Sequence, residues 1–564
     1  MHFRLRVAVS AACLALLGPL AVTGAAEAAA PDVTSAVEAA RVDRVPTPDL
    51  AWTPCHGHAE CASVRLPLDY DQPAGATTRV GLLRLKARDP GRRLGSLFVN
   101  PGGPGGSATD IALRARSLLT PELLDRFDIV GMDPRGIGTS EQLRCFATPA
   151  DQAAVLRPLY GPGFPFRPAQ EARAIEAARA FGQACSTTGR PLAAAMSTGQ
   201  VARDMDVVRR AVGDRRLTFL GLSYGSYLGQ VYANLFPDRV RAVAIDGVLD
   251  PLAWTGNAAT WTTPVTQRLR SAEGAYAALR EILRRCDDAG RQRCAFAGGD
   301  PMRKLEVIAD RLKAAPLLIE DPSGAFRYSY ATLVQSLQSY LYIEQGYVPI
   351  TAELAALYDL TDPARTGAAA DSPAALGLAA SARARARYEN SVETFSGVLC
   401  SDSVNPVDAS AWAVAADRGA PYFNRFRVWQ SVQCASGSWK AQDEDAYRGP
   451  FTRRTASPVL VVGNYWDPAT NYEGAVTAAR LLPHSVLLSS DSWGHTAYGT
   501  SSCVTGAISR YLLSSSTPPP GTRCVGDVQP FEPVPPQAGS QRFPVLPLLP
   551  PSTEPDVAAA ALAG

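Results

Sequence analysis

The stretch RLTFLGLSYGSYLG (216–229) joins an apolar run to a serine that stands between two glycines. The run before Gly221 is typical of a buried strand, and the segment after Gly225 is typical of a helix. Gly221, Ser223 and Gly225 thus form the pattern G-x-S-x-G, in which the turn strains the serine backbone and exposes its oxygen above a sheet. The helix N-terminus beneath the serine favours developing negative charge. The stretch therefore predicts that Ser223 is a nucleophile.

Strand-like and helix-like segments alternate on both sides of this turn. Short apolar runs end in loops rich in glycine and proline, and they occupy residues 79–87, 95–103, 127–136, 240–251 and 457–467. Strands that alternate with helices are typical of an α/β chain with a mostly parallel sheet. The order of a serine, then an acid, then a histidine, which is considered below, narrows this expectation to an α/β-hydrolase fold.

The middle of the chain has a different pattern. Helix-like segments dominate residues 252–450, and strand signals are few there. We expect a mainly helical cap inserted into the α/β core, so that residues 29–251 and 451–528 form the two parts of that core. Residues 529–564 are rich in proline and alanine, which is typical of an extended or disordered tail.

The N-terminus has the pattern of a Sec-type signal peptide over residues 1–28. Basic residues precede the apolar stretch VAVSAACLALLGPLAV, and small residues follow it up to Ala28. Gly18 and Pro19 shorten the apolar core below a comfortable bilayer span, which argues against a membrane anchor. We expect a secreted, extracellular protein.

The cysteines agree with export. The chain has 11 cysteines, and removal of Cys13 with the signal peptide leaves an even number. Connectivity stays open, but pairing of neighbours is the simplest arrangement and suits an oxidising compartment. The segment CHGHAEC (55–61) has zinc binding as an alternative, through His56, His58 and the two cysteines, but a small disulfide loop is favoured, and we predict no metal or other cofactor. The neighbouring pairs are Cys55 and Cys61, Cys145 and Cys185, Cys286 and Cys294, Cys400 and Cys434, and Cys503 and Cys524.

The overall charge narrows the possible partners. The chain has 55 Lys and Arg against 53 Asp and Glu, so its net charge is close to zero. A broad surface for nucleic acid or anionic membrane is therefore not expected.

A serine nucleophile needs a base and an acid, and histidine is scarce in this chain. Only His484 and His495 follow Ser223. His495 lies in a loop after the last expected strand, where a base can reach the serine, whereas His484 reads as a surface residue between a helix and a strand. Asp467 ends the preceding strand and is the expected acid, because Asp491 lies on the histidine's own loop and reads as a solvated turn residue.

The glycine-rich loop VNPGGPGGS (99–107) follows another expected strand. Such a loop can turn a backbone N–H toward a tetrahedral oxyanion, and we favour the Gly103 N–H paired with the Tyr224 N–H. A phosphate-binding loop is disfavoured because no G-K-[ST] follows the glycines. An ordinary tight turn is the remaining alternative.

Six motifs together give the chain a family resemblance that covers residues 50–525. In chain order they are NPGGPGGS, DPRGIGTS, GLSYGSYLG, AIDGVLDP, GNYWDPAT and WGHT. With them the chain resembles the secreted tripeptidyl aminopeptidases of actinobacteria, relatives of the proline iminopeptidases. The resemblance implies Ser223 as nucleophile, Asp467 as orienting acid and His495 as general base, with cleavage of short peptides from free N-termini. Proline iminopeptidases have a histidine where this chain has Pro101, which favours the tripeptidyl branch over proline release.

An exopeptidase must also bind the ammonium group of its substrate. The insertion contains SVETFSGVLCSDS, and its carboxylates Glu393 and Asp402 are the candidates for this role. A secreted carboxylesterase or lipase with the same Ser–Asp–His set, or a proline iminopeptidase, is the alternative function. The complete catalytic set argues against a binding protein that has lost its activity.

Overall fold

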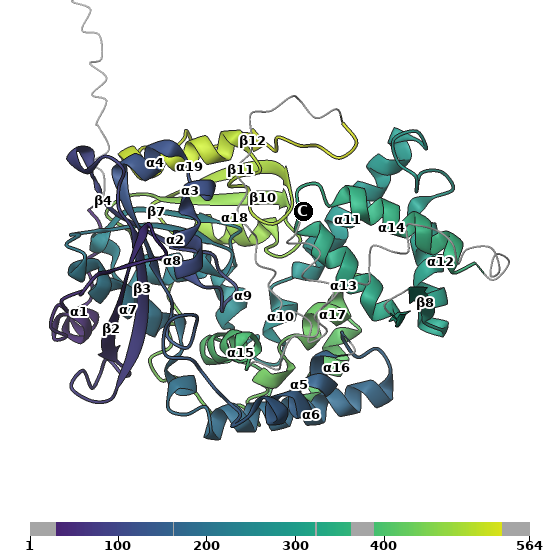
Figure 1. The fold of residues 1–564 in the computed structure, drawn as a ribbon, viewed down its shortest axis with the longest axis horizontal. Helices are drawn as coiled ribbons and strands as arrows, with labels where there is room; N and C mark the ends of the chain where they lie inside the picture. The colour runs from purple at the N-terminus through teal and green to yellow at the C-terminus, as the bar shows by residue number, and fades with distance from the viewer. Residues whose placement is uncertain (1–29, 162, 322–323, 363–387, 533–564) are drawn as a thin grey trace, which may run out of the picture. The chain divides into compact units, whose positions relative to one another are not determined.

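One large β-sheet connects the N-terminal and C-terminal parts of the chain (Figure 1). The computed structural model describes residues 30–161, 163–321, 324–362 and 388–532. Within these residues, ten strands join in the order β1-β2-β3-β5-β4-β6-β7-β10-β11-β12. The strands are β1 Thr53–Cys55, β2 Ala59–Pro67, β3 Thr77–Leu85, β4 Gly95–Asn100, β5 Phe127–Met132, β6 Leu217–Leu222, β7 Val240–Asp246, β10 Val459–Trp466, β11 Ser485–Trp493 and β12 Arg523–Val525.

The sheet is antiparallel at one end and parallel elsewhere. The pairs β1–β2, β2–β3 and β3–β5 are antiparallel, and every pair from β5–β4 to β11–β12 is parallel. Alternate side chains point to opposite faces, so Leu97 and Val99 of β4 join one apolar cluster while Phe98 joins another. Both faces are therefore buried, as parallel strands require. The predicted α/β-hydrolase fold with a mostly parallel sheet is confirmed.

Helices cover the two faces of this sheet. One apolar cluster contains residues of α7 (Thr198–Ala211), α8 (Tyr224–Leu235) and α18 (Tyr472–Leu481). The cluster on the other face contains residues of the four helices α2 Ala108–Leu113, α3 Ala115–Leu118, α4 Pro121–Arg126 and α19 Ser502–Ser514. The remaining short elements of this part of the chain are α1 Ala36–Asp43, η1 Pro90–Arg92, η2 Leu192–Ala195 and η3 Pro237–Arg239.

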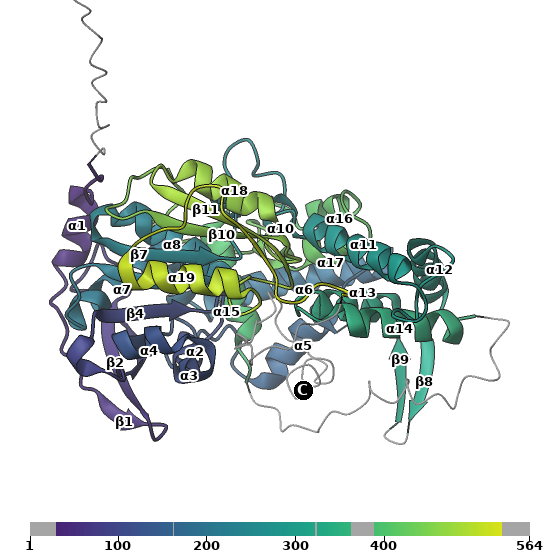
Figure 2. The ribbon, with the colours of Figure 1, turned by 90° about the horizontal axis from the view of Figure 1, so that it is seen from above.

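The segment between β7 and β10 is mainly helical, as the sequence predicts. It also contains a hairpin, β8–β9, that the sequence analysis does not anticipate and that extends beside α14 in Figure 2. Helices α11 to α14 share a further apolar cluster with Phe423 and Phe426 of α17 and with Trp493 of β11. The elements are α9 Pro251–Thr255, α10 Val265–Arg268, α11 Ser271–Ala289, α12 Pro301–Ala314, β8 Leu317–Asp321, β9 Gly324–Tyr328, α13 Tyr330–Leu341, α14 Tyr347–Leu360, α15 Ser391–Asp402, α16 Ser410–Ala416, α17 Phe423–Trp429 and η5 Val432–Cys434.

Two helices from the first part of the chain pack with this insertion. Figure 1 shows α5 (Pro149–Tyr160) and α6 (Pro168–Thr187) beside α15 and α16. The backbone of Gly182 in α6 approaches Ser438 so closely that a Cβ there would lie 3.1 Å from the Ser438 Oγ and carbonyl carbon. The helical layer is thus built from both sides of β6 in the sequence, although residues 29–251 were expected to form only the core.

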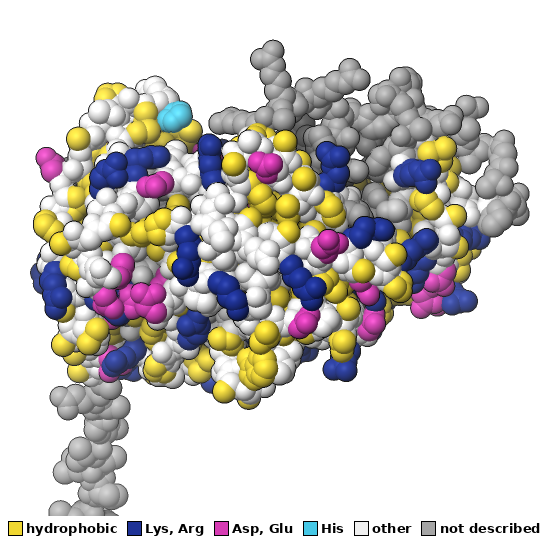
Figure 3. All heavy atoms as spheres, turned by 90° about the horizontal axis from the view of Figure 1, so that it is seen from below, with side chains coloured by type: hydrophobic (Ala, Val, Ile, Leu, Met, Phe, Trp, Pro, Cys, Tyr) yellow, Lys and Arg dark blue, Asp and Glu magenta, His cyan; other side chains and the backbone are white. Residues whose placement is uncertain are grey.

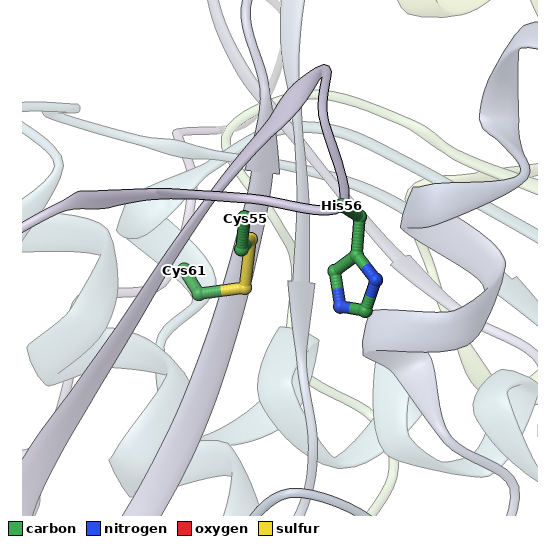
Figure 4. Close-up of side chains that lie close together, drawn as sticks. All are labelled: Cys55, His56 and Cys61. Atoms are coloured by element: carbon green, nitrogen blue, oxygen red, sulfur yellow. A yellow bond between two sulfur atoms is a disulfide. The ribbon is translucent and has the colours of Figure 1, made fainter.

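The structure contains the five expected disulfides between neighbouring cysteines. Figure 4 shows the sulfurs of Cys55 and Cys61 bonded to each other, with the His56 ring beside them. A cysteine binds a metal ion as its thiolate, and a disulfide sulfur is not a thiolate. The zinc alternative for residues 55–61 therefore lacks its two sulfur ligands in this oxidised state.

The predicted signal peptide and residues 533–564 of the predicted tail lie outside the described residues. None of the described helices is both long enough and apolar enough to cross a membrane. On the face shown in Figure 3, Lys and Arg side chains are interspersed with Asp and Glu.

Candidate active site

Ser223 stands at the sharp turn between β6 and α8. Its backbone has φ 56° and ψ −124°, a strained conformation for a residue with a side chain. The turn is tight: a Cβ at Gly221 would lie 2.2 Å from the Gly225 carbonyl oxygen, and one at Gly225 would lie 2.8 Å from the Asn100 carbonyl oxygen. The Ser223 Oγ is buried and has no hydrogen-bond partner among the described residues. The strained turn that the sequence predicts is present.

Asp467 and His495 come together at the carboxyl edge of the sheet. Asp467 directly follows β10 and His495 follows β11, and these two strands are parallel neighbours. The His495 Nδ1 lies 2.9 Å from Oδ1 and 2.8 Å from Oδ2 of Asp467. The His495 Nε2 is buried without a hydrogen-bond partner among the described residues. An acceptor on Nδ1 assigns the proton to that nitrogen, so the lone pair of Nε2 is available as a base.

The Asp467 carboxylate is held by many donors. It accepts hydrogen bonds from the Ala469 N–H and the Thr470 N–H at 2.8 Å, from the Thr470 hydroxyl at 2.9 Å and from the Thr496 N–H at 3.2 Å. Burial raises the pKa of this carboxyl, but the charge and hydrogen bond of His495 and the backbone amides outweigh burial and leave the pKa below its ordinary value. Asp467 is therefore ionised and fixed.

A second buried acid, Asp246, supports the histidine loop. It ends β7 and accepts hydrogen bonds from the Ala497 N–H at 2.9 Å and the Tyr498 N–H at 2.7 Å. Burial raises its pKa to about 6, against the lowering effect of these amides. Sequence reasoning placed Asp246 inside the AIDGVLDP motif without assigning it a role. Its position at a strand end was the available signal.

The glycine-rich loop lies directly against the nucleophile turn. A Cβ at Gly102 would lie 2.7 Å from the Ser223 Cβ and 2.8 Å from the Tyr224 nitrogen, so only glycine fits there. The Gly102 N–H donates to the Asn100 side chain at 2.9 Å, whereas the Gly103 N–H has no acceptor among the described residues. The Tyr224 N–H is in the first turn of α8, where helix N–H groups lack intrahelical partners. Both predicted oxyanion donors thus belong to segments that meet at Ser223.

Asp133 fixes the segment that follows this loop. Its carboxylate accepts from the Ser107 hydroxyl at 2.9 Å, the Thr109 N–H at 3.0 Å and the Thr139 N–H at 2.7 Å. The two motifs NPGGPGGS and DPRGIGTS are therefore joined through one buried carboxylate.

The alternative base and acid have other partners. The His484 Nδ1 is hydrogen bonded to the Thr455 carbonyl at 2.7 Å, and Asp491 accepts from the Trp466 indole N–H at 2.7 Å. Neither side chain is part of the Asp467–His495 cluster.

Asp402, a candidate for binding the substrate amine, lies behind the nucleophile turn. It ends α15 and accepts from the Thr198 N–H at 2.8 Å, the Thr198 hydroxyl at 2.6 Å and the Trp254 indole N–H at 3.0 Å. The Thr198 hydroxyl also bonds the Tyr224 hydroxyl at 2.6 Å. Burial raises the Asp402 pKa to about 6. Through Thr198, the carboxylate is connected to the residue next to Ser223.

Glu393, the other candidate, is buried at the start of α15. Its carboxylate accepts hydrogen bonds from the Tyr388 hydroxyl, from the Gln152 amide at 3.2 Å and from the Cys145 N–H at 3.4 Å. Burial raises its pKa to about 7. The structure therefore places both carboxylates in buried hydrogen-bonded networks, and their role in binding a substrate amine stays a prediction.

The helical insertion covers the triad candidates. The backbone N–H of His495 donates to the Tyr342 carbonyl at 3.1 Å. The rings of His495 and Tyr342 lie 5.1 Å apart in an edge-on arrangement. Arg427 of α17 donates to the Tyr342 hydroxyl at 3.3 Å and to the Pro468 carbonyl at 2.9 Å. Ser223 and His495 are only 2% and 1% exposed. Sequence reasoning missed Tyr342 and Arg427, because neither lies in a recognisable motif.

Comparison with known proteins agrees with this geometry. Residues 95–278 match the family model described as "alpha/beta hydrolase fold", and residues 420–524 match the one described as "TAP-like protein". The chain is 30% identical over 545 residues to "Serine protease Hip1" of Mycobacterium tuberculosis, covering 92% of this chain and 96% of that protein. The chain belongs to the TAP-like family of α/β-hydrolases. Ser223 lies in the first matched region of this TAP-like chain, and Asp467 and His495 lie in the second.

Two further relatives show the range of names in this family. "Tripeptidyl aminopeptidase" of Streptomyces coelicolor is 29% identical over 513 residues, covering 88% of this TAP-like chain and 89% of that protein. "Carboxylesterase B" of Mycobacterium tuberculosis is 31% identical over 521 residues, covering 88% of this chain and 95% of that protein. The chain is accordingly a serine hydrolase of the TAP peptidase type.

Proposed function

We propose that this protein is a secreted serine exopeptidase that releases short peptides, most readily tripeptides, from free N-termini. One observation carries the proposal: His495 is bonded through Nδ1 to an ionised Asp467, while its Nε2 and the Ser223 Oγ are both buried without partners among the described residues. These two atoms are the ones that a proton transfer from serine to histidine would use. Five disulfides support export, because such bonds persist in oxidising compartments.

The reaction is an acyl transfer in two halves. His495 removes the Ser223 proton as the oxygen attacks the substrate carbonyl, and the Gly103 and Tyr224 N–H groups donate to the resulting oxyanion. His495 then protonates the leaving amine, and water releases the acyl group by the same steps in reverse. Asp467 stays ionised throughout and stabilises the imidazolium.

The covered site favours short substrates. The nucleophile and base lie beneath Tyr342 and Arg427 of the insertion, so a folded protein loop has little room to reach them. A free peptide end fits such a site better than the middle of a chain. A preference for free N-termini then requires a group that reads the ammonium.

The test compares a tripeptide anilide with the same anilide acetylated at its N-terminus. Loss of a recognised ammonium leaves buried polar groups unpaired, so acetylation should lower kcat/KM at least about a hundred-fold, or about 2.8 kcal/mol. The Ser223→Ala protein serves as the blank for adventitious hydrolysis. Equal rates on the free and acetylated peptides would remove the aminopeptidase assignment and leave the serine-hydrolase chemistry intact.

Ester hydrolysis is the second candidate function, because a relative of comparable identity is named "Carboxylesterase B". The same triad would act on both classes of substrate. Comparing kcat/KM for an acyl para-nitrophenyl ester with that for a tripeptide anilide separates them. A peptidase accelerates the less reactive anilide efficiently, whereas an esterase hydrolyses the ester and leaves the anilide almost untouched.

A further inference from the structure

One residue, Asp246 at the end of β7, links two strained positions of the candidate active site. Ser223 has φ 56°, and Thr496, the residue after His495, has φ 70°. Such values are costly for a residue with a side chain, above all for a β-branched one, and they persist only where neighbouring groups hold the backbone. The groups that hold these two positions therefore decide where the nucleophile and the base lie.

Asp246 bonds to both sides of the site. Its backbone carbonyl accepts a hydrogen bond from the Ser223 N–H at 2.9 Å. Its carboxylate accepts from the Ala497 N–H at 2.9 Å and from the Tyr498 N–H at 2.7 Å, the two amides that follow Thr496. The nucleophile turn and the loop of the base are thus fastened to the same residue.

The next residue, Gly247, brings the same strand end against the base. A Cβ at Gly247 would lie 3.1 Å from the His495 Cε1 and 2.9 Å from the Thr496 Cγ2. Asp467 accepts from the Thr496 N–H at 3.2 Å. The loop that carries His495 is therefore fixed from two neighbouring strands, by Asp246 at the end of β7 and by Asp467 after β10.

The Asp246 carboxyl makes these bonds as a buried anion. The residue is fully buried, and a charged acceptor forms stronger hydrogen bonds with N–H groups than a neutral acid does. Burial raises its pKa to about 6, whereas the two amides and the charge of His495 lower the pKa and the charge of Asp467 raises it. Asp246 is therefore charged at neutral pH and becomes neutral as the pH falls below about 6.

We propose that Asp246 is a positioning residue that sets the nucleophile and the base against each other by holding both strained backbones at once. Because it is fully buried, it acts through Ser223 and His495 and not on the substrate. This inference rests on the proposed serine-hydrolase mechanism, but not on whether the substrate is a peptide or an ester.

The test measures kcat and KM of Asp246→Asn on whichever of the tripeptide anilide and the acyl ester the wild-type protein hydrolyses faster. A side-chain amide has one acceptor oxygen and a donor group, so it cannot replace a carboxylate toward two N–H groups. A misplacement of 1 Å can cost on the order of a hundred-fold in rate, so kcat should fall at least about ten-fold at pH 8 while KM stays unchanged.

The pH dependence of this loss distinguishes positioning by the anion from a merely structural role. The variant side chain resembles the protonated wild-type residue, so the ratio of wild-type to variant kcat should shrink toward one as the pH falls below about 6. A ratio near one at pH 8, or a large ratio that does not change with pH, would overturn the proposal.

Asp214→Asn is the matched control. Asp214 also accepts from a backbone N–H, that of Ser96 at 2.8 Å, and burial raises its pKa as well. Ser96 lies at the start of β4, and because β4 runs parallel to β6, this is the edge of the sheet opposite Ser223. The control should keep the wild-type kcat at every pH. A comparable loss in the control would show that losing any such backbone contact lowers the rate, and would overturn the specific role of Asp246.

If Asp246→Asn does not fold, the acid limb of the wild-type kcat/KM decides the question. Protonation of His495 alone gives a slope of one against pH, and loss of the Asp246 charge in the same range makes the limb steeper. A slope above one below about pH 6 supports the proposal, and a slope of one down to pH 5 overturns it.

Two outcomes separate this role from the proposed function. Full activity of Ser223→Ala would reject the serine mechanism, and the role of Asp246 with it. A Ser223-dependent enzyme in which Asp246→Asn keeps the wild-type kcat would reject the role of Asp246 alone.

Discussion

The hydrolase core and the helical insertion both bury polar side chains around the catalytic candidates, but they satisfy them differently. In the core, Asp467 accepts hydrogen bonds from backbone amides, a hydroxyl and His495, and the reacting atoms of Ser223 and His495 are left without partners. In the insertion, several buried side chains each leave one polar atom without a partner among the described residues. They are Gln338, Arg427, Trp429, Gln430 and Gln433.

This difference distinguishes the core residues that carry out the reaction from the insertion residues that contact the substrate. The ends of parallel strands fix the core groups before any substrate arrives, which is the preorganisation that catalysis requires. The insertion's unused donors and acceptors match what a peptide brings, since each peptide bond carries one donor and one acceptor. The core thus fixes Asp467 and His495 without substrate, and the reacting atoms of Ser223 and His495 and these polar atoms of the insertion are left for a substrate to contact.

The largest expected effect tests the core. Ser223→Ala and His495→Ala should each lower kcat on the order of a million-fold while leaving the fold intact, because the triad acts as a unit. His484→Ala is the matched control, and its effect should be mild, since the His484 ring is hydrogen bonded to the Thr455 carbonyl and not to Asp467. A Ser223→Ala protein that keeps a tenth of its activity, or a reversed ranking of the two histidines, contradicts the assignment.

A second prediction concerns how the free energy of unfolding depends on pH through Glu393 of the insertion. Burial raises the Glu393 pKa from 4.5 to about 7, so the folded protein binds this proton more tightly than the unfolded chain. The contribution of the protonated Glu393 carboxyl to the free energy of unfolding is complete below the unfolded-state pKa. It disappears as the pH rises through about 7. The wild-type free energy of unfolding should therefore fall by about 3 kcal/mol relative to Glu393→Gln between pH 4.5 and pH 8.

Urea denaturation of both proteins at several pH values measures this difference. The glutamine cannot titrate, so the slope of the difference reports Glu393 even if the substitution weakens one hydrogen bond. Glu176→Gln, at an exposed position of α6, is the control and should give a flat difference. A flat difference for Glu393→Gln as well would mean that its carboxyl titrates normally.

The sequence predicted the core better than the insertion, for a physical reason. Ser223, Asp467 and His495 each follow an apolar run, and the end of a parallel strand fixes where the next residue lies. Arg427 lies on α17 and Gln430 directly after its end, and a helical pattern predicts which face packs but not which residues it packs against. The hydrogen bond from Arg427 to the Pro468 carbonyl, 41 positions away, could therefore not be predicted from the sequence.

The same reason explains why the packing partner of α6 and the hydrogen-bond partner of Asp402 were not predicted. The partner of α6 lies some 250 residues later, as in the hydrogen bond from the Lys440 N–H to the Ser186 hydroxyl, and no local pattern records such a contact. A carboxylate in a helix of the insertion could be predicted as functional, but its partner Thr198, 204 positions earlier, could not.

A third prediction asks whether Asp402 belongs to recognition or to chemistry. The carboxylate is connected through Thr198 to Tyr224, so we expect it to position the oxyanion donor rather than to read the substrate amine. Asp402→Asn should lower kcat/KM about thirty-fold on the free tripeptide anilide, since a charged hydrogen bond contributes about 1.5–3 kcal/mol. The kcat/KM of this variant for the acetylated anilide should fall by the same factor. For both substrates kcat should fall while KM stays unchanged.

The partition between the two substrates is what decides this question. A loss confined to the free peptide would make Asp402 the amine-binding residue that its sequence context first suggested. Glu393→Gln gives the matched comparison from the other end of α15, and an amine-specific loss there would assign the role to Glu393 instead.

The smallest expected effect compares one disulfide from each region. The Cys400–Cys434 bridge in the insertion spans 34 positions, and the Cys55–Cys61 bridge in the core spans 6. Closing a longer loop removes more entropy from the unfolded chain, so replacing the insertion pair by serines should destabilise the protein by about 1.5 kcal/mol more than replacing the core pair. Urea denaturation of the two double variants measures the difference.

The Cys400–Cys434 variant should also lose activity, because that bridge anchors the end of α15 that carries Asp402. Equal stability losses would show that strain or residual structure, rather than loop length, governs these bridges, and unchanged activity would disconnect α15 from the nucleophile turn.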